Sequence, residues 1–301
     1  MAPSPERILV IGAGELGGAV LAALSDRHPD AAPSVLLRPS DAPRHIRLRT
    51  ELAARGVPVV EADVATATVP ELAAILAGFD TVVNGVGFGA GPGLQRRITE
   101  AVLRAGVWRY VPWQFGVDYD AIGRGSPQDL FDEQLDVRDM LRAQRGTAWV
   151  IVSTGMFTSF LFDPAVGIVD LETNTVHALG SWDTEVTVTT PEDIGVLTAE
   201  ILRERPPVRD RVVYVAGDTI SYGELADIVE RVRGEPVRRE VWTLPRLLAD
   251  LDRHPDDHLH KYRAVFAQGK GVAWPRAGTY NAVRGIPTTG TEQWVRARLA
   301  G

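Results

Sequence analysis

Short apolar runs alternate with longer segments of helical periodicity through the first half of the chain. β-branched and other apolar residues cluster in short runs that predict buried strands at 8–11, 34–37, 57–60, 81–83, 110–111 and 149–152. Between these runs, apolar residues recur at helical spacing at 16–24, 46–54, 70–76, 94–105 and 130–141. Strands that alternate with helices are joined by right-handed crossovers. The pattern therefore predicts an α/β protein with a doubly wound parallel sheet and helices on both faces.

The pattern becomes irregular in the second half. Its features are an apolar aromatic stretch at 154–164, strand-like pieces at 167–170 and 175–179, a helix start at 190–193 and a buried strand at 212–215. The helix start reads Thr-Pro-Glu-Asp, in which a hydroxyl N-cap precedes a proline and two acids. We expect residues 1–152 to form the first domain. Residues 153–301 should form mainly a smaller, discontinuous α+β lobe over the carboxyl edge of the sheet, while the strand near 212–215 returns to the main sheet.

A glycine turn stands between the first predicted strand and helix. Residues 7–18 read RILVIGAGELGG, which places Gly12, Gly14 and Gly17 in the spacing G-x-G-x-x-G, with Glu15 and Leu16 opening the helix. The three glycines permit a tight turn, close approach of a pyrophosphate and close helix–strand packing. The helix N-terminus adds free N–H donors for phosphate. The turn predicts a Rossmann-type dinucleotide-binding domain in residues 1–152, the alternative being a turn needed only for packing.

Residues after the next predicted strands indicate which dinucleotide is bound. Arg38 follows the second strand, where an acid would accept hydrogen bonds from the adenosine ribose, and a guanidinium there suits a 2′-phosphate. With Ser40 and Arg44 nearby, it predicts NADP(H) as the cofactor. The alternative is NAD(H), with Arg38 solvated and Asp41 on the ribose. The remaining predicted cofactor contacts are Asp63 and Val64 at the adenine, and Gly85, Val86 and Gly87 at the pyrophosphate and nicotinamide ribose.

Composition and charge limit the cellular compartment and the kinds of partner that the protein can have. The 301-residue chain has no cysteine, a formal net charge of −7, 45% hydrophobic and 24% charged residues. The lack of cysteine excludes disulfides and thiolate chemistry and favours a reducing compartment. The acidic balance argues against nucleic-acid binding, and no apolar run reaches the about 20 residues that span a bilayer. We expect a soluble cytoplasmic protein without nucleic-acid or membrane partners, and leave open whether it forms a homo-oligomer.

Three histidines in the C-terminal third of the chain are closely spaced. His254, His258 and His260 lie close together before Lys261, and histidines at short spacing can hold a metal. The polar residues between them are also typical of an ordinary solvated turn. We therefore expect no metal site.

The chain resembles the NmrA-like and isoflavone-reductase-like branch of the atypical short-chain dehydrogenases. The matching pieces are the glycine turn, Leu37-Arg38-Pro39, Gln95, RYVPWQFG at 109–116, FDEQLDVR at 131–138 and VSTGMF at 152–157. The resemblance implies an NADP(H)-dependent reductase fold over most of the chain. It also implies that Trp113, Gln114, Phe115 and Gln134 contact the cofactor.

One position departs from the family pattern. Reductases of this group carry a lysine with an acid–base role where this chain has Gln134, and no lysine precedes Lys261. A glutamine amide can hydrogen-bond a ribose or polarise a carbonyl, but it does not titrate near neutral pH. Gln134 therefore stays a candidate catalytic residue without being the general acid. Tyr119 is the candidate proton donor, although an ordinary tyrosine pKa near 10 requires help from its surroundings; histidines or water are alternatives.

Three functions follow from these residues. The first is reduction of a small aromatic or conjugated carbonyl, alkene or imine by hydride transfer from NADPH. The expected substrate contacts, which could equally be core residues, are Met156, Phe157, Phe160, Trp182, Tyr262 and Phe266. The second is a non-catalytic NADP(H) sensor that acts through a protein partner, which the missing lysine favours. The third is a non-redox enzyme with a bound dinucleotide.

Overall fold

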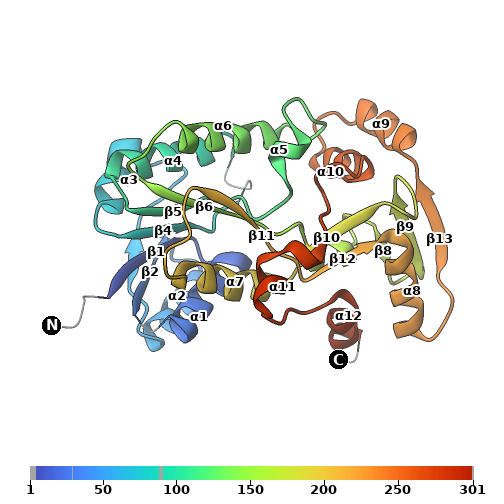
Figure 1. Cartoon of the computed structure of the whole chain (residues 1–301), viewed down its shortest axis with the longest axis horizontal. Coiled ribbons are helices and arrows are strands. Elements are labelled where there is room, and N and C mark those ends of the chain that lie inside the picture. Colours follow the sequence, from blue (N-terminus) through green and yellow to red (C-terminus); the bar gives the residue numbers. More distant parts are fainter. Residues whose placement is uncertain (1–4, 29, 88–90, 300–301) are drawn as a thin grey trace. The chain divides into compact units, whose positions relative to one another are not determined.

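A seven-stranded sheet brings together the strands of residues 6–153 and one strand from further along the chain (Figure 1). The computed structural model describes residues 5–28, 30–87 and 91–299. The strands lie in the order β11-β6-β5-β4-β1-β2-β3. Their bounds are β1 (Glu6–Ile11), β2 (Ala31–Leu37), β3 (Val59–Glu61), β4 (Thr81–Asn84), β5 (Arg109–Val111), β6 (Ala148–Ser153) and β11 (Arg211–Tyr214). All pairings from β3 through β6 are parallel, which confirms the predicted doubly wound sheet.

Helices cover both faces of this sheet. In Figure 1, α3, α4 and α6 lie on one face, and α1, α2 and α7 lie on the other. Their bounds are α1 (Glu15–Arg27), α2 (Pro43–Ala54), α3 (Val69–Leu76), α4 (Leu94–Ala105), α6 (Leu130–Arg142) and α7 (Pro191–Arg203). The packing of α7 on α1 is close, because a Cβ on Gly195 would lie 2.5 Å from the carbonyl oxygen of Ala19.

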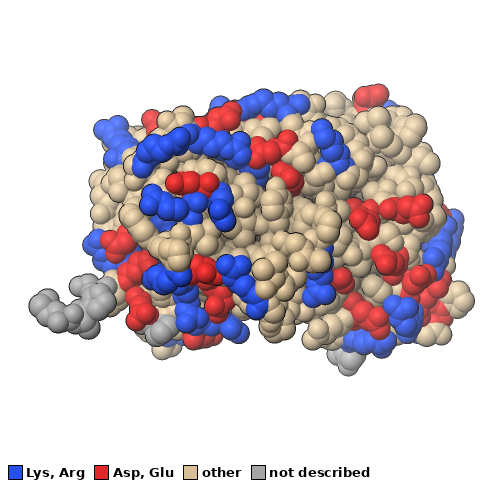
Figure 2. Space-filling model, in the orientation of Figure 1, with Lys and Arg blue, Asp and Glu red and all other residues tan. Residues whose placement is uncertain are grey.

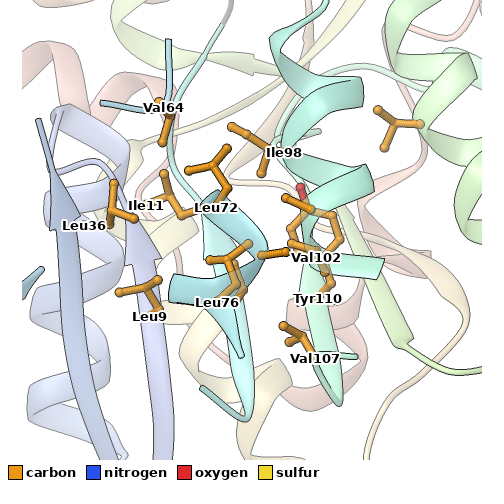
Figure 3. Packing of buried hydrophobic residues seen from close by; sticks show 14 of the residues in the cluster. Leu9, Ile11, Leu36, Val64, Leu72, Leu76, Ile98, Val102, Val107 and Tyr110 are labelled. Atoms are coloured by element: carbon orange, nitrogen blue, oxygen red, sulfur yellow. The ribbon is translucent and has the colours of Figure 1, made fainter. Parts of the chain in front are cut away.

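The core of the sheet is made by the residues that the apolar runs predict. Leu9 and Ile11 of β1 point towards Leu72 and Leu76 of α3, and Tyr110 of β5 lies beneath α4 (Figure 3). These side chains are all buried. The start of α3 is set locally by a capping box, in which the Thr68 hydroxyl and the Glu71 carboxylate each accept from the other residue's backbone N–H.

The chain divides into two compact units. The first consists of Met1–Gln114, Asp136–Val152 and Ile194–Val212, and the second consists of Phe115–Leu135, Ser153–Asp193 and Val213–Gly301. The sequence predicted a boundary after residue 152 and the return of one strand near 212–215, and this division is more interleaved than that. Residues from Phe115 to Leu135 join the second unit, and most of α7 joins the first.

The second unit contains two small sheets with strand orders β12-β10-β7 and β13-β9-β8. Its strands are β7 (Met156–Phe157), β8 (Val169–Asp170), β9 (Thr175–Leu179), β10 (Glu185–Thr189), β12 (Asp218–Ser221) and β13 (Arg238–Trp242). Its other α-helices are α5 (Tyr119–Ile122), α8 (Tyr222–Arg233), α9 (Leu244–Arg253), α10 (His258–Ala267), α11 (Tyr280–Arg284) and α12 (Thr291–Leu299). Two 3₁₀ turns, Thr158–Phe162 and Arg276–Gly278, complete it.

Charged side chains of both signs are interspersed over the face drawn in Figure 2. Among the residues that the structure describes, no helix combines the length and apolar character needed to cross a bilayer.

A buried ionic cluster lies at the amino edge of the seven-stranded sheet. The Arg109 guanidinium is 1% exposed, pairs with the Glu6 carboxylate and donates to the carbonyl of Leu202 at 2.9 Å. Beside this pair, the His28 ring is buried, and neither ring nitrogen has a hydrogen-bond partner among the described residues. Burial lowers the pKa of His28 from its ordinary value of 6.5, more than the nearby Glu6 carboxylate raises it.

The His28 environment predicts a stability loss in mild acid. The folded-state pKa of His28 lies below the unfolded-state value, so in mild acid the unfolded chain binds more protons than the folded one. The contribution of the neutral His28 ring to folding stability is therefore present above about pH 6.5 and is lost below it. From about pH 7.5 to 5.5 we expect the wild-type chain to lose about 1 kcal/mol more free energy of unfolding than His28→Gln. Urea titrations at both pH values measure the difference, and equal losses in the two proteins would contradict it.

Candidate dinucleotide site

The turn between β1 and α1 has the geometry that its glycines predict. Gly12 has a φ of +83°, and a Cβ there would lie 2.7 Å from the Val86 side chain. A Cβ on Gly17 would lie 2.1 Å from the carbonyl oxygen of Gly12, so α1 starts against the turn itself. A Cβ on Gly85 would come within 3.0 Å of the Gly17 Cα. These three backbones therefore approach more closely than side chains allow.

The N-terminus of α1 opens at the same turn. Gly14 is the N-cap residue, so no side chain caps the first-turn N–H groups, and a Cβ there would meet nothing within 4 Å. Backbone donors and the positive end of the helix dipole thus face open space beside an exposed Gly14. The helix then continues with exposed Glu15 and buried Leu16. This arrangement is suited to a phosphate group.

A cleft of about 860 Å³ extends from this turn. It is lined by the ends of β1 and β2, by one face of α2, and by the loops after β3 and β4. The lining residues are Ile11, Gly12, Ala13, Gly14, Leu36, Leu37, Arg38, Arg44, His45, Leu48, Arg49, Ala62, Asp63, Val64, Ala65, Gly85, Val86 and Gly87. Its volume falls within the range of about 300–1,000 Å³ typical of small-molecule and cofactor sites.

Basic side chains gather at the β2–α2 end of the cleft. Arg38, Arg44 and Arg49 line it, and Arg49 is also held by the Glu61 carboxylate at 3.1 Å and by the carbonyl of Ser40. Among the described residues, no ion pair within 4 Å is found for Arg38 or Arg44. This end of the cleft therefore carries uncompensated positive charge that suits an anionic group.

Two further residues named from the sequence lie at this end of the site. Asp63 and Val64 line the cleft, and their contact with the adenine stays a prediction. Ser40 is not among the lining residues; its hydroxyl accepts from the backbone N–H of Ala42 at 3.3 Å, so it shapes the turn before α2.

Buried amides hold the loop after β4. Asn84 donates to the Gln95 side-chain oxygen at 2.8 Å and accepts from the backbone N–H of Val86 at 3.0 Å. Gln95 donates in turn to the carbonyl of Val86 at 2.9 Å. The loop that carries Val86 and Gly87 into the cleft is thus fixed from both sides.

Gln95 predicts a positioning effect on nucleotide binding. Gln95→Leu would leave Asn84 and the Val86 carbonyl without this partner. We expect the dissociation constant for NADP⁺ to rise about 5- to 20-fold. The matched control is Gln144→Leu, because Gln144 makes comparable amide bonds to Leu141 and Thr147 in the α6–β6 turn. Calorimetric titration of both variants measures the effect, and equal affinity losses would show general destabilisation instead.

The predicted contacts after β5 are divided between the two units. Trp113 packs on Gly87, where a Cβ would lie 2.9 Å from the indole ring. Gln114 is buried and accepts from the Arg138 guanidinium at 2.8 Å. Phe115 and Gln134 are both buried and belong to the second unit. Their predicted contacts with the cofactor stay predictions.

The predicted proton donor lies in an aromatic cluster of the second unit. Tyr119 and Tyr262 each pack edge-on against Phe131, with ring centroids 5.0 and 5.8 Å away. The Tyr119 hydroxyl lies 2.6 Å from the position a Cβ on Gly116 would take, so it is held against that backbone. Burial raises the pKa of Tyr262 well above its ordinary value.

The other predicted substrate residues are found in different parts of the same unit. Phe157 and Phe160 form an edge-on pair at 6.2 Å, and Phe160 is among the exposed large apolar residues. Met156 and Phe266 are buried. Trp182 contacts the Arg239 guanidinium, and its carbonyl accepts from Gly223 at the start of α8.

Two histidines of the C-terminal group lie side by side. His254 and His260 stack with their ring centroids 5.1 Å apart. Within the described ranges, no group of three or more His, Cys, Asp or Glu side chains could hold a metal ion.

Of the α2 wall of the cleft, sequence reasoning named only Arg44. His45 and Arg49 are four residues apart, as are Arg44 and Leu48, and both pairs line the cleft. Residues at this spacing share one face of a helix. The periodic spacing was therefore a usable signal, but which face of α2 is turned to the glycine turn depends on packing.

The fold and the cleft together define a dinucleotide-binding protein of the Rossmann type. The NmrA-like family model matches residues 4–273, and the chain belongs to that family.

Three known proteins are similar to this chain. An NmrA-like family domain-containing oxidoreductase of Gibberella moniliformis is 47% identical over 300 residues, which cover 97% of each chain. An isoflavone reductase homolog of Zea mays is 28% identical over 85% of this chain and 83% of its own. The solved binary complex of leucoanthocyanidin reductase with NADPH from Vitis vinifera superposes with a TM-score of 0.82 at 20% identity, covering 98% of this chain and 100% of that one.

Proposed function

We propose that this protein is an NADP(H)-dependent oxidoreductase that reduces small aromatic or conjugated substrates. The observation that carries the proposal is the arginine-lined end of a cleft that begins at an open helix N-terminus. The family relatives support it, since one is named an oxidoreductase and another an isoflavone reductase homolog. The Vitis vinifera structure, which contains NADPH, has the same fold.

We assign the binding and orientation of the nucleotide to residues of the first unit. The backbone of Gly12 and Gly14 and the first turn of α1 would hold the pyrophosphate, and Arg38 and Arg44 would hold a 2′-phosphate. Val86 and Gly87, fixed by Asn84 and Gln95, would set the position of the nicotinamide half. When bound, the reduced nicotinamide supplies the hydride.

The proton that completes a reduction needs a source other than residue 134. Gln134 has no proton to give near neutral pH, so its proposed role is to hold a ribose or a carbonyl through its amide. Tyr119 is our proposed donor, with water as the alternative when the acceptor is activated enough to need only orientation and charge stabilisation. The cysteine-free composition supports a reducing compartment, and we propose the cytoplasm.

Gln134 also supports a second candidate function, a non-catalytic NADP(H) sensor. A protein that binds a dinucleotide without an acid–base lysine can report its redox state to a partner through differential affinity. The two functions are separated by turnover. A reductase oxidises NADPH when conjugated aromatic carbonyls or alkenes are added, whereas a sensor shows no turnover and prefers one redox form.

The choice of NADP(H) over NAD(H) is tested at Arg38. We expect Arg38→Gln to weaken NADP⁺ binding about 10- to 100-fold by removing charge-assisted hydrogen bonds, and to leave NAD⁺ affinity unchanged. Arg47→Gln is the matched control, because Arg47 lies exposed on α2 and is not among the cleft residues. Calorimetric titration of each variant with NADP⁺ and with NAD⁺ gives four dissociation constants. Equal loss for both nucleotides would refute the assignment of the phosphate to Arg38.

A further inference from the structure

His45 is the one titratable imidazole among the side chains that line the cleft. It lies on the first turns of α2, and its backbone N–H donates to the carbonyl of Ala42 at 2.8 Å. Its Nδ1 atom is buried and has no hydrogen-bond partner in the part of the chain that the structure describes. A buried ring nitrogen without a partner is costly, so this side chain calls for a specific role.

The surroundings of His45 are strongly basic. Burial lowers the pKa of its ring, and the positive charges of Arg44, Arg38 and Arg49 lower it further. The ring is therefore harder to protonate in the free protein than an ordinary histidine. An anion bound among these guanidinium groups would offset their repulsion and favour the protonated form of the ring.

Of the three guanidinium groups, Arg49 has an acidic partner, whereas Arg38 and Arg44 have no ion pair among the described residues. Glu61 of β3 pairs with Arg49, whereas Asp63 lines the cleft with one oxygen accepting from the backbone N–H of Ala65. Asp41 lies exposed before α2, and Arg47 lies exposed further along it.

We propose that His45 is a specificity-determining residue, whose imidazolium form binds a phosphate monoester on the adenosine ribose together with Arg38 and Arg44. The inference rests on the proposed function, since it assigns the 2′-phosphate of NADP(H) to this end of the cleft. A dianionic phosphate stabilises the imidazolium, so binding transfers a proton from solvent to the His45 ring. A nucleotide with an unmodified ribose places no anion there and takes up no proton at this site.

The test compares NADP⁺ and NAD⁺ binding by calorimetry from about pH 8 to about pH 6.5, a range above the second phosphate pKa near 6. For the wild-type protein we expect the NADP⁺ dissociation constant to fall about 3- to 10-fold over this range, with proton uptake visible in buffers of different ionisation enthalpy. His45→Gln should bind NADP⁺ more weakly at the acid end and lose the proton uptake. His45→Lys, which keeps a positive charge throughout, should bind tightly with little pH dependence. NAD⁺ should bind all three proteins with the same shallow pH dependence.

Two outcomes overturn the inference, and they are distinguishable. If NADP⁺ binds tightly but the wild-type protein and His45→Gln share one pH profile and one proton count, His45 has no such role and the proposed function stands. If neither nucleotide binds any of the three proteins at any pH, the proposed function fails as well.

Discussion

Gly17→Ala is expected to abolish tight nucleotide binding, whereas Gly18→Ala, one residue further along α1, is expected to preserve it. A Cβ on Gly17 would lie 2.1 Å from the Gly12 carbonyl oxygen, so α1 must move away from the turn that presents its N–H groups. A Cβ on Gly18 meets nothing within 4 Å. We expect a rise of at least about 100-fold in the NADP⁺ dissociation constant for Gly17→Ala. For Gly18→Ala we expect unchanged affinity and a gain of about 0.5–1 kcal/mol in stability.

A third glycine variant keeps this prediction testable if Gly17→Ala does not fold. Gly14 has φ −71° and ψ −166°, which any residue adopts, and its Cβ position is open. Gly14→Val should therefore fold, with a loss of about 1 kcal/mol because valine is a poorer N-cap than glycine, while its side chain fills the space beside the first-turn N–H groups. Calorimetry and thermal unfolding measure both properties. Wild-type affinity in Gly14→Val would show that the phosphate does not bind at this turn.

Arg109→Met is expected to destabilise the protein by about 3–5 kcal/mol, because it leaves the Glu6 carboxylate without its partner in a largely buried site. The guanidinium that is lost also donates to the Thr81 hydroxyl at 3.2 Å and to the Leu202 carbonyl at 2.9 Å, tying β1, β4, β5 and α7 together. Urea unfolding monitored by circular dichroism measures the loss.

Two controls separate the buried pair from ion pairing in general. Arg7→Met removes the exposed Arg7–Asp80 pair, 3.0 Å long at the same sheet edge, and should have little effect because solvent screens such pairs. The double variant Glu6→Gln with Arg109→Met should recover part of the stability lost in Arg109→Met, since no charge is then left without its partner. A double variant that is no more stable than the single one would contradict the buried-charge explanation.

Most of the regular structure of the first unit could be predicted from the sequence. The helix predicted at 94–105 has the bounds of α4, and in the second unit the strand predicted at 175–179 has those of β9. The prediction at 34–37 was short, because β2 begins at Ala31, which pairs with Glu6 of β1. Apolar runs mark which residues are buried, whereas the ends of a strand depend on backbone pairing with a neighbour distant in the chain.

The dinucleotide site also has one part that the sequence predicts and one part that depends on tertiary packing. Its phosphate-binding turn is encoded locally, because the spacing of Gly12, Gly14 and Gly17 sets the backbone geometry within one strand–helix unit. Of the α2 wall only Arg44 was predicted, since the basic residues His45 and Arg49 read equally well as part of a solvated helix face.

The sequence by itself determined the alternation of strands and helices, the glycine turn and the absence of a titratable group at Gln134. Each of these depends on residue type and on neighbours within a few positions. Only the tertiary structure decided that His45 lies in the cleft with Arg38, and that Arg109 pairs with Glu6, 103 positions away. These contacts depend on how crossover helices pack on the sheet, and packing is set by the shapes of surfaces that no local pattern records.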